Sequence, residues 1–296
     1  MSILVDKDTK LIVQGITGTE GLSHARAMRD YGTRVLGGVS PEKPGERING
    51  FPVYRSVTEA KAETGANTSA IFVPPAGAAD AIHEALEAGI ELIVCVTEGI
   101  PVADMIRIRR VLPDYPASRL IGPNCPGVIS PGKAKVGIMP GAIHAQGCVG
   151  IVSRSGTLMY EAVAQLGALG LGESTCVGIG GDFLVGMDYR EVLALFEGDD
   201  ETNGVLLIGE VGGMSEIEAA EYVRSTMTKP VAAFVAGKSA PRGRRMGHAG
   251  AIAEDSASSA ASKMEALLSR GLTVIEDPAC MGQVLSWMLQ NSPILL

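Results

Sequence analysis

The sequence has few aromatic residues, few histidines and few cysteines. Aromatic residues make up 4% of the 296 residues, and there are only four histidines and five cysteines. The cysteines are odd in number, lie far apart and form no C-x-x-C pair, so neither a disulfide framework nor a zinc site is indicated. This pattern is typical of a reducing compartment, and we expect a cytoplasmic protein.

Long apolar runs and an excess of basic charge are also missing. Runs such as residues 90–96 are far shorter than the ~20 residues of a membrane-spanning helix, and residues 1–10 contain no apolar signal segment. The formal net charge of −8 argues against nucleic-acid binding, because a run of phosphates would stay unneutralised. We therefore expect neither a membrane nor a nucleic-acid partner, whereas small phosphorylated ligands need only local donors.

What the chain does contain is glycine, 38 residues of it, together with many small aliphatic residues. This composition is typical of α/β proteins in which parallel strands are buried on both faces. The length suits two domains. We predict a first domain at residues 1–125, an ordered connection rich in proline and glycine at 126–147, and a second domain at 148–296.

The first domain opens with the pattern of a Rossmann-like unit. An apolar strand at residues 11–14 leads into a G-x-x-G-x-x-G turn and a helix, so backbone N–H groups and a helix N-terminus can receive a phosphate. The second strand, residues 34–39, is not followed by the acidic residue that would bind the ribose of a nicotinamide cofactor. Glu42 lies beyond a proline, and the adjacent Lys43 suits a phosphate better.

Further alternation of strands and helices brings several loops to one edge of this sheet. Strands are expected at residues 69–73 and 91–96, with a helix at 78–88 between them. Ligands of such sheets bind beyond the carboxyl ends of the strands. We therefore predict a ligand crevice here, with Pro74 and Pro75 beside it and the following binding residues: Thr17, Gly18, Thr19, Glu20, Lys43, Val96, Thr97 and Glu98.

The second domain repeats the strand and helix pattern. Strands are expected at residues 149–152, 174–179, 204–208 and 231–236. The first of them is followed by a strand-to-helix turn made of Ser155, Gly156 and Thr157. Hydroxyl residues often serve there only as helix caps, but the glycine leaves the free N–H groups open to approach, which favours a phosphate cradle.

Two candidate catalytic side chains follow later strands. Glu210 stands between glycines, and we expect it to point into the cleft. The next helix carries three more acidic residues, Glu216, Glu218 and Glu221, which we assign to a solvated face. His248 lies in a loop of small residues after the fourth strand.

A glycine-framed imidazole such as that of His248 is accessible. At an ordinary pKa of about 6.5 it is mostly neutral, so a ring nitrogen can attack phosphorus without a separate base. By itself the pattern fits a loop histidine without function equally well. Ser155, Asp182, Glu210 and His248 all follow strands of one parallel sheet, however, and this convergence favours a nucleophile whose ring Glu210 orients.

Several motifs resemble those of the α subunits of succinate–CoA ligases (succinyl-CoA synthetases) and of sister acid–CoA ligases such as malate–CoA ligase. They are QGITG at residues 14–18, IGPNCPG at 121–127, SRSGTL at 153–158, VGIGGD at 177–182, GE at 209–210 and RMGHAGA at 245–251. The resemblance implies a Rossmann-like CoA-binding domain followed by a flavodoxin-like ligase domain. It also implies that the crevice residues contact coenzyme A, that Tyr160 lies by the acid and that His248 is transiently phosphorylated.

The resemblance further implies a partner, a β subunit with an ATP-grasp fold that binds ATP or GTP with Mg²⁺. Succinate is the expected acid. The family's T-P-G-K-G-G loop is replaced here by Ser-Pro-Glu-Lys-Pro-Gly at 40–45, and its G-G-D-P-[IV]-x-G-[ST]-x-F by Gly-Gly-Asp-Phe-Leu-Val-Gly-Met-Asp-Tyr at 180–189. These departures leave malate or another small anionic acid open. From the residues alone, a non-catalytic CoA-binding regulatory protein also stays open, and Tyr160 can either reach the cleft or pack inside.

Overall fold

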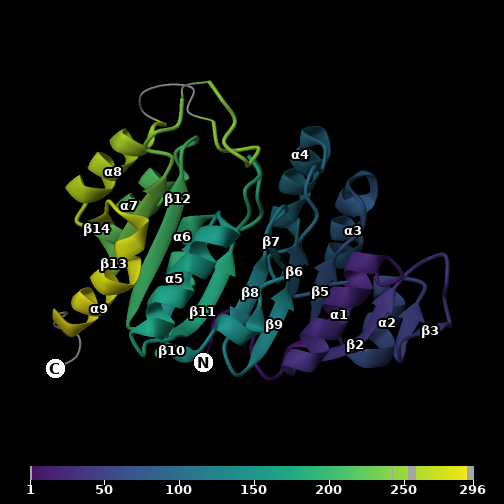
Figure 1. The fold of residues 1–296 in the computed structure, drawn as a ribbon. Coiled ribbons are helices and arrows are strands. Elements are labelled where there is room, and N and C mark those ends of the chain that lie inside the picture. Colours follow the sequence, from purple (N-terminus) through teal and green to yellow (C-terminus); the bar gives the residue numbers. More distant parts are fainter. Residues whose placement is uncertain (1, 242, 253–257, 292–296) are drawn as a thin grey trace.

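The computed structural model describes residues 2–241, 243–252 and 258–291, which form two seven-stranded, mostly parallel sheets flanked by helices (Figure 1). The prediction of an α/β protein with a Rossmann-like unit followed by a flavodoxin-like unit is confirmed. No helix within these described ranges has the length and apolarity needed to cross a membrane.

The first sheet has the strand order β3-β4-β2-β1-β5-β6-β7, and all its pairings are parallel except that of β3 with β4. Strands β2 to β4 follow β1 on one side of the sheet, and β5 to β7 lie on its other side. The switch point at which such sheets bind ligands therefore lies between β1 and β5. The strands are β1 (Lys10–Gln14), β2 (Arg34–Val39), β3 (Arg47–Ile48), β4 (Phe51–Tyr54), β5 (Thr68–Ile71), β6 (Leu92–Cys95) and β7 (Arg119–Ile121). The helices are α1 (Thr19–Tyr31), α2 (Val57–Thr64), α3 (Pro75–Glu87) and α4 (Val102–Val111).

The second sheet has the order β14-β13-β12-β10-β11-β8-β9, whose parallel part starts at β10 and follows the flavodoxin arrangement. The strands are β8 (Gly127–Ser130), β9 (Ala134–Gly137), β10 (Gln146–Ser153), β11 (Glu173–Gly178), β12 (Gly204–Glu210), β13 (Val231–Ala236) and β14 (Thr273–Ile275). The helices are α5 (Gly156–Ala168), α6 (Tyr189–Glu197), α7 (Ser215–Thr226), α8 (Ala260–Ser269) and α9 (Met281–Asn291).

The segment 126–147, which we predicted as a connection, contributes two strands to the second sheet. Strands β8 and β9 form an antiparallel hairpin, and β8 pairs with β11. Both strands have only four residues, and a Cβ on Gly127 would lie 2.0 Å from the carbonyl oxygen of Val136. The glycines that suggested a loop therefore serve the close approach of two backbones, and the second sheet begins at Gly127.

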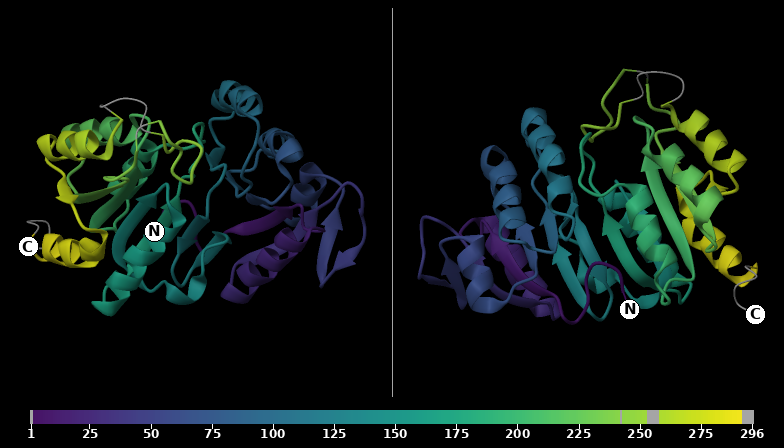
Figure 2. Two further views of the ribbon diagram at one scale, coloured as in Figure 1. Left: turned by 45° about the horizontal axis from the view of Figure 1, so that its top comes forward. Right: turned by 180° about the vertical axis from the view of Figure 1, so that it is seen from behind.

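Both faces of each sheet are covered. In the second sheet, alternate residues of β12 point to opposite sides: Leu206 and Ile208 pack with α5 and α9, whereas Val205 and Leu207 pack with α6, α7 and α8. Figure 2 shows these helices on the two sides of the sheet. In the first sheet, α2, α3 and α4 cover one face, and α1 lies on the other.

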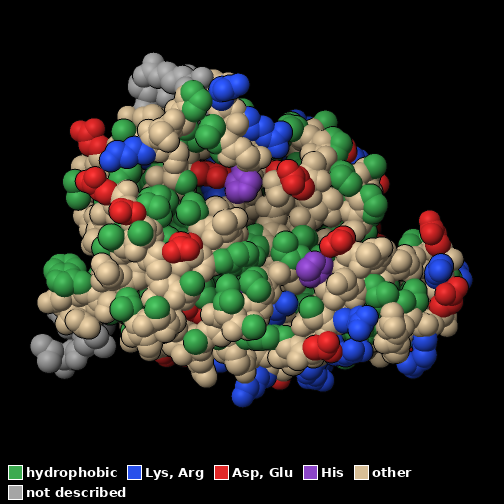
Figure 3. All heavy atoms as spheres, in the orientation of Figure 1, with side chains coloured by type: hydrophobic (Ala, Val, Ile, Leu, Met, Phe, Trp, Pro, Cys, Tyr) green, Lys and Arg blue, Asp and Glu red, His purple; other side chains and the backbone are tan. Residues whose placement is uncertain are grey.

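The two halves share one hydrophobic core, which includes buried residues of β1, β6, β8, β10 and β11. Helix α1 packs against β9 (Figure 1), and the hydroxyl of Thr33 donates to the carbonyl of Lys135 at 2.8 Å. This shared core fixes the carboxyl edges of the two sheets relative to each other. On the face drawn in Figure 3, acidic and basic side chains are interspersed.

The N-terminal turn of α1 packs directly on the backbone of the β1 exit loop. A Cβ on Gly21 would lie 2.2 Å from the carbonyl oxygen of Gly15, whereas a Cβ on Gly167 in α5 would meet no atom within 4 Å. We expect Gly21→Ala to lower the free energy of unfolding by about 1–3 kcal/mol, as overpacking does. Gly167→Ala should raise it by about 0.5–1 kcal/mol, because the unfolded chain loses freedom. Urea unfolding of the two variants measures both effects. An unaltered free energy of unfolding in Gly21→Ala would contradict the close packing of α1 on the β1 exit loop.

Candidate active site

Four segments meet at the carboxyl edge of the second sheet (Figure 1). Arg154 directly follows β10, Asp182 lies in the loop after β11, Glu210 is the last residue of β12, and His248 lies in the loop after β13. Strands β13, β12, β10 and β11 are consecutive neighbours in the sheet. Residues far apart in the sequence are therefore brought to one edge, as expected for a parallel sheet.

Glu210 holds the ring of His248. The Nδ1 atom of His248 lies 2.8 Å from Oε2 of Glu210, whose side chain is only 7% exposed, whereas that of His248 is 30% exposed. When Nδ1 donates its hydrogen to the carboxylate, the neutral ring carries its lone pair on Nε2. Among the described residues, none forms a hydrogen bond with Nε2. The ring lies over Gly181, where a Cβ would be 2.4 Å from Cγ of His248, so only glycine fits there.

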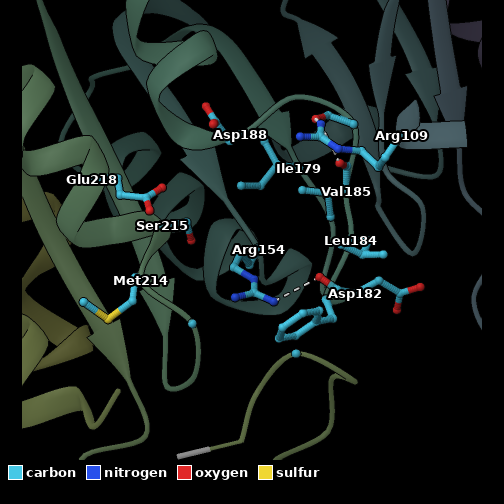
Figure 4. A pocket seen from close by; sticks show the side chains of 14 residues that line it. Arg109, Arg154, Ile179, Asp182, Leu184, Val185, Asp188, Met214, Ser215 and Glu218 are labelled. Atoms are coloured by element: carbon cyan, nitrogen blue, oxygen red, sulfur yellow. Dashed lines mark hydrogen bonds between the residues drawn. The ribbon is translucent and has the colours of Figure 1, made fainter. Parts of the chain in front are cut away.

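Arg154 ties three of these segments together. Its Nε lies 3.1 Å from Oε1 of Glu210, and its Nη2 donates to the carbonyl oxygen of Asp182 at 3.2 Å, the bond drawn in Figure 4. The guanidinium also lies against Gly250 of the His248 loop, where a Cβ would be 2.1 Å from Nη2. Arg154 is only 8% exposed. Sequence reasoning included it in a motif but gave it no role, although a basic residue at the end of a buried strand was the available signal.

The Glu210 carboxylate raises the pKa of His248 above its ordinary value, chiefly through the hydrogen bond. Burial of the ring and the positive charge of Arg154 act in the opposite direction, while the charge of Glu98 adds to the increase. We expected the ordinary pKa of an exposed loop histidine, and this expectation needs correction. The ring holds its proton to higher pH, so the reactive neutral form requires loss of the proton from Nε2.

The cap at Ser155 forms as expected. Its hydroxyl accepts a hydrogen bond from the N–H of Leu158 at 3.3 Å, and α5 begins at Gly156. The N–H groups of Gly156 and Thr157 lie in the first turn, where a helix offers them no carbonyl. Within the described ranges, no hydrogen bond or ion pair joins these three residues to His248, and the link between the two segments is Arg154.

Tyr160 is half-buried on α5. Its ring meets that of His144 edge-on, with 6.4 Å between the centroids, and burial raises the pKa of Tyr160 to about 12. The hydroxyl lies near the start of the helix, because a Cβ on Gly156 would be 3.6 Å from the phenolic oxygen. Tyr160 thus packs against His144 on one side and has its hydroxyl near the turn at Gly156.

The predicted crevice residues of the first sheet lie at the carboxyl ends of its strands. In the β1–α1 turn, the Oγ of Thr17 lies 3.5 Å from that of Ser40, and Gly18 precedes α1 without a side-chain cap. Thr19 and Glu20 are exposed in the first turn of α1, and Lys43 is exposed beyond β2. The uncapped N–H groups of α1 fit a phosphate.

The remaining crevice residues lie after β6, and one of them, Glu98, contacts the second domain. The hydroxyl of Thr97 donates to the carbonyl oxygen of Val73 at 2.7 Å, and the N–H of Val96 donates to the carbonyl oxygen of Ile71. The carboxylate of Glu98 lies 3.8 Å from the guanidinium of Arg245, in the His248 loop. This edge of the first sheet therefore faces His248.

Asn124 reinforces the link between the two sheets. It accepts from the N–H of Gly181 at 3.0 Å through its backbone, and its side-chain amide donates to Asp182 at 2.9 Å. Sequence reasoning gave Asn124 no role of its own.

The residues at 183–189 that differ from the family pattern lie in different surroundings. Met187, which replaces a hydroxyl residue of the family pattern, is buried in the shared core. Phe183 is 70% exposed and lines a cavity of about 260 Å³ beside Arg154 (Figure 4). Arg109 of α4 donates to the carbonyl oxygen of Gly186 at 2.7 Å, so the first domain holds this loop. Phe183, together with Leu184 in the same cavity, changes the surface near the active site.

One of the acidic residues that we assigned to a solvated face is buried. Glu216 is 0% exposed and forms an ion pair with Lys263 of α8, which is also 0% exposed. Glu218 is exposed, and Glu221 pairs with Arg270. The prediction for Glu216 is wrong because the first turn of α7 lies behind the end of β12. Within the described ranges, no group of three His, Cys, Asp or Glu side chains is arranged to hold a metal ion.

Two family models match this chain: a CoA binding domain at residues 6–99 and a CoA-ligase at residues 152–273. The solved structure of ATP citrate lyase from Methanothrix soehngenii in complex with citrate and coenzyme A has a TM-score of 0.89 at 23% identity. The match covers 97% of this chain but spans only 50% of the lyase chain, and it is a likeness of fold alone.

Curated relatives are much more similar. The succinate–CoA ligase [ADP-forming] subunit alpha of Aquifex aeolicus is 57% identical over 98% of this chain and 95% of its own length. The malate–CoA ligase subunit alpha of Methylorubrum extorquens is 52% identical over 99% and 100%, and a succinate–CoA ligase [ADP-forming] subunit alpha of Staphylococcus aureus is 50% identical over 96% and 94%. The chain therefore belongs to the CoA-ligase family that includes the α subunits of succinate–CoA and malate–CoA ligases.

Proposed function

We propose that this chain is the α subunit of a nucleoside-triphosphate-dependent acid–CoA ligase in which His248 carries the phosphoryl group. The observation that supports this most strongly is the contact between His248 Nδ1 and Glu210 Oε2 at 2.8 Å, with Nε2 free of hydrogen bonds to the described residues. A ring held in this way presents one nitrogen as a nucleophile. Residues 1–125 would bind coenzyme A, and the second domain would carry the phosphohistidine.

In the first step, Nε2 of His248 attacks the γ-phosphorus of the nucleotide and the nucleoside diphosphate leaves. The ring becomes positively charged as the new N–P bond forms, and the carboxylate of Glu210 stabilises this charge through Nδ1–H. The hydroxyl of Ser155 and the N–H groups of Gly156 and Thr157 at the start of α5 are suited to the phosphoryl oxygens, whereas the N–H of Ser155 donates to the hydroxyl of Ser153 at 3.0 Å. A helix N-terminus contributes about 0.3–1 kcal/mol to such an interaction.

In the next steps, a carboxylate oxygen of the acid attacks the phosphorus, the N–P bond breaks and an acyl phosphate forms. The thiolate sulfur of coenzyme A then attacks the acyl carbon, and inorganic phosphate leaves as the thioester forms. Tyr160, neutral because burial raises its pKa to about 12, would donate a hydrogen bond to the acid. The residues proposed to contact coenzyme A are Thr17, Gly18, Thr19, Glu20, Lys43, Val96, Thr97 and Glu98.

The nucleotide is proposed to bind to a partner. The relatives are named α subunits, which implies a second subunit in those proteins. For this chain we propose a β subunit with an ATP-grasp fold that holds ATP or GTP with Mg²⁺, and a cytoplasmic location. The exposed ring edge of His248 is the group that would meet the nucleotide.

Succinate is the acid that we propose, because two of the relatives above are named succinate–CoA ligase subunits at 57% and 50% identity. Malate is the alternative, since the malate–CoA ligase subunit is 52% identical. Phe183, exposed beside Arg154, is a departure from the family pattern that lies at the site.

The phosphorylation itself gives the direct test. We expect the complex of this chain with its β subunit to take up label from γ-labelled ATP or GTP as an acid-labile phosphoryl group. His248→Ala should abolish the label, whereas His83→Ala, which changes a histidine of α3 that lies next to Glu87, should retain it. Equal labelling of the wild type and of His248→Ala would exclude His248 as the acceptor.

The pH dependence of labelling tests Glu210. Because Glu210 raises the pKa of His248, the wild-type rate should fall with decreasing pH at a higher pH than for an ordinary imidazole. In Glu210→Gln the carboxylate is gone while burial still lowers the pKa, so this fall should move to lower pH. The maximal rate should drop roughly 10- to 100-fold, as with other residues that orient a functional histidine. The affinity for coenzyme A should stay unchanged. Equal losses of labelling rate and of coenzyme A affinity would mean that Glu210 has only a structural role.

The role of Tyr160 can be separated from phosphorylation. We expect Tyr160→Phe to raise the KM for the acid about 10-fold, the value of one hydrogen bond to a charged group. The rate of His248 labelling should not change. Tyr115→Phe, a change at a hydroxyl beyond α4, is the control. Steady-state assays with succinate and malate measure the effect and also identify the preferred acid. An unchanged KM for both acids would place Tyr160 outside the acid site.

A further inference from the structure

A buried ion pair lies directly behind the end of β12. Lys263 of α8 and Glu216 of α7 are both 0% exposed and contact each other. The ammonium of Lys263 also donates to the carbonyl oxygens of Glu210 at 2.8 Å and Gly212 at 2.6 Å. The Oε1 atom of Glu216 accepts from the N–H of Glu210 at 3.2 Å. The backbone N–H and C=O of Glu210 are thus both held by side chains of two helices.

The position of Glu210 explains why this support is needed. Glu210 is the last residue of β12, and after it the chain leaves the sheet through Val211 and Gly212, the latter at a positive φ of 89°. The regular strand therefore precedes Glu210 but does not continue after it, and in the sheet Glu210 pairs with Ala236 of β13. A Cβ on Gly209 would lie 2.5 Å from Cγ of Glu216, so the glutamate packs closely along the strand backbone.

Stability alone does not account for the pair. Burying two charges costs solvation energy, and apolar residues of similar volume often serve a fold equally well or better. Among the described residues, each hydrogen bond from the pair to main-chain atoms outside their own helices is made at Glu210 or Gly212. The geometry that these bonds preserve is that of the residue whose carboxylate holds His248.

We propose that Lys263 and Glu216 are positioning residues for the phosphorylation of His248. They fix the backbone of Glu210, and its carboxylate thereby keeps its contact with Nδ1. Neither side chain touches the histidine. This inference rests on the proposed function, in which Nε2 of a correctly oriented ring attacks phosphorus.

In the described part of the chain, charged and titratable groups around Glu210 and His248 come from five elements. They are Arg154 after β10, Glu98 after β6, Tyr189 of α6, Glu216 of α7 and Lys263 of α8. Because Lys263 and Glu216 carry opposite charges, removing both leaves the local net charge unchanged. A change in the titration of His248 would then report a movement of Glu210.

The test is the double variant Lys263→Met/Glu216→Leu in the full chain, alone and with the β subunit. Apolar side chains replace both charges, so no unpaired buried charge remains. We expect a coenzyme A affinity close to wild type and a lower temperature of thermal unfolding, because the backbone groups of Glu210 and Gly212 lose their hydrogen-bond partners. The labelling rate of His248 should fall roughly 10-fold, and its pH dependence should move to lower pH. NMR titration of the His248 ring, identified by comparison with His248→Gln, should show the same shift.

Lys229→Met provides the matched control. Lys229 also donates to backbone carbonyl oxygens, those of Phe196 and Asp199, but it lies just before β13, at the opposite edge of the sheet. Neither the labelling rate nor the titration of His248 should change in this variant. If the double variant does not fold, Gly209→Ala replaces it, because its Cβ would displace Glu216 while both charges stay. The same slower labelling and lower titration are expected.

Wild-type labelling and titration of His248 in a folded double variant, or in Gly209→Ala, would overturn the proposal and leave the pair a structural one. The NMR titration also separates this inference from the proposed function. If no labelling occurs in any protein, the proposed function fails. A lowered titration of His248 in the variant would then still demonstrate positioning of Glu210, and an unaltered one would refute it.

Discussion

The rest of the site depends on one hydrogen bond, that between the Nδ1 of His248 and the buried carboxylate of Glu210. Because Nδ1 makes this bond, Nε2 carries the lone pair of the neutral ring, and the bond raises the pKa of His248. It can form only if the loop after β13 returns to the end of β12. Gly181 and Gly250 permit this return, because a side chain at either position would collide with His248 or Arg154.

The buried carboxylate in turn needs compensation, and the structure provides it in two layers. Arg154 faces the Oε1 of Glu210 at 3.1 Å and reaches the loop after β11. Behind the strand, Lys263 and Glu216 hold the main chain of the same residue. Burying a charge is costly unless the charge is paired, and Arg154 supplies the opposite charge beside Glu210.

The edges of the two sheets face each other because the halves share a core. Asn124 after β7 binds Gly181 and Asp182, and Glu98 after β6 pairs with Arg245 in the His248 loop. The proposed coenzyme A crevice and the proposed phosphohistidine therefore belong to one continuous region. In the proposed reaction the phosphoryl and acyl groups pass between these two edges.

The sequence by itself determined the α/β class, the bounds of strands such as β2 and β13, and the candidate pair of Glu210 and His248. Strong apolar runs and glycine-framed polar residues carry these signals locally. Only the tertiary structure decided that β8 and β9 join the second sheet, that Arg154 bridges three loops and that Glu216 is buried against Lys263. The reason is that four-residue strands lack a readable period, and the burial of a charged side chain depends on partners that lie tens of residues away.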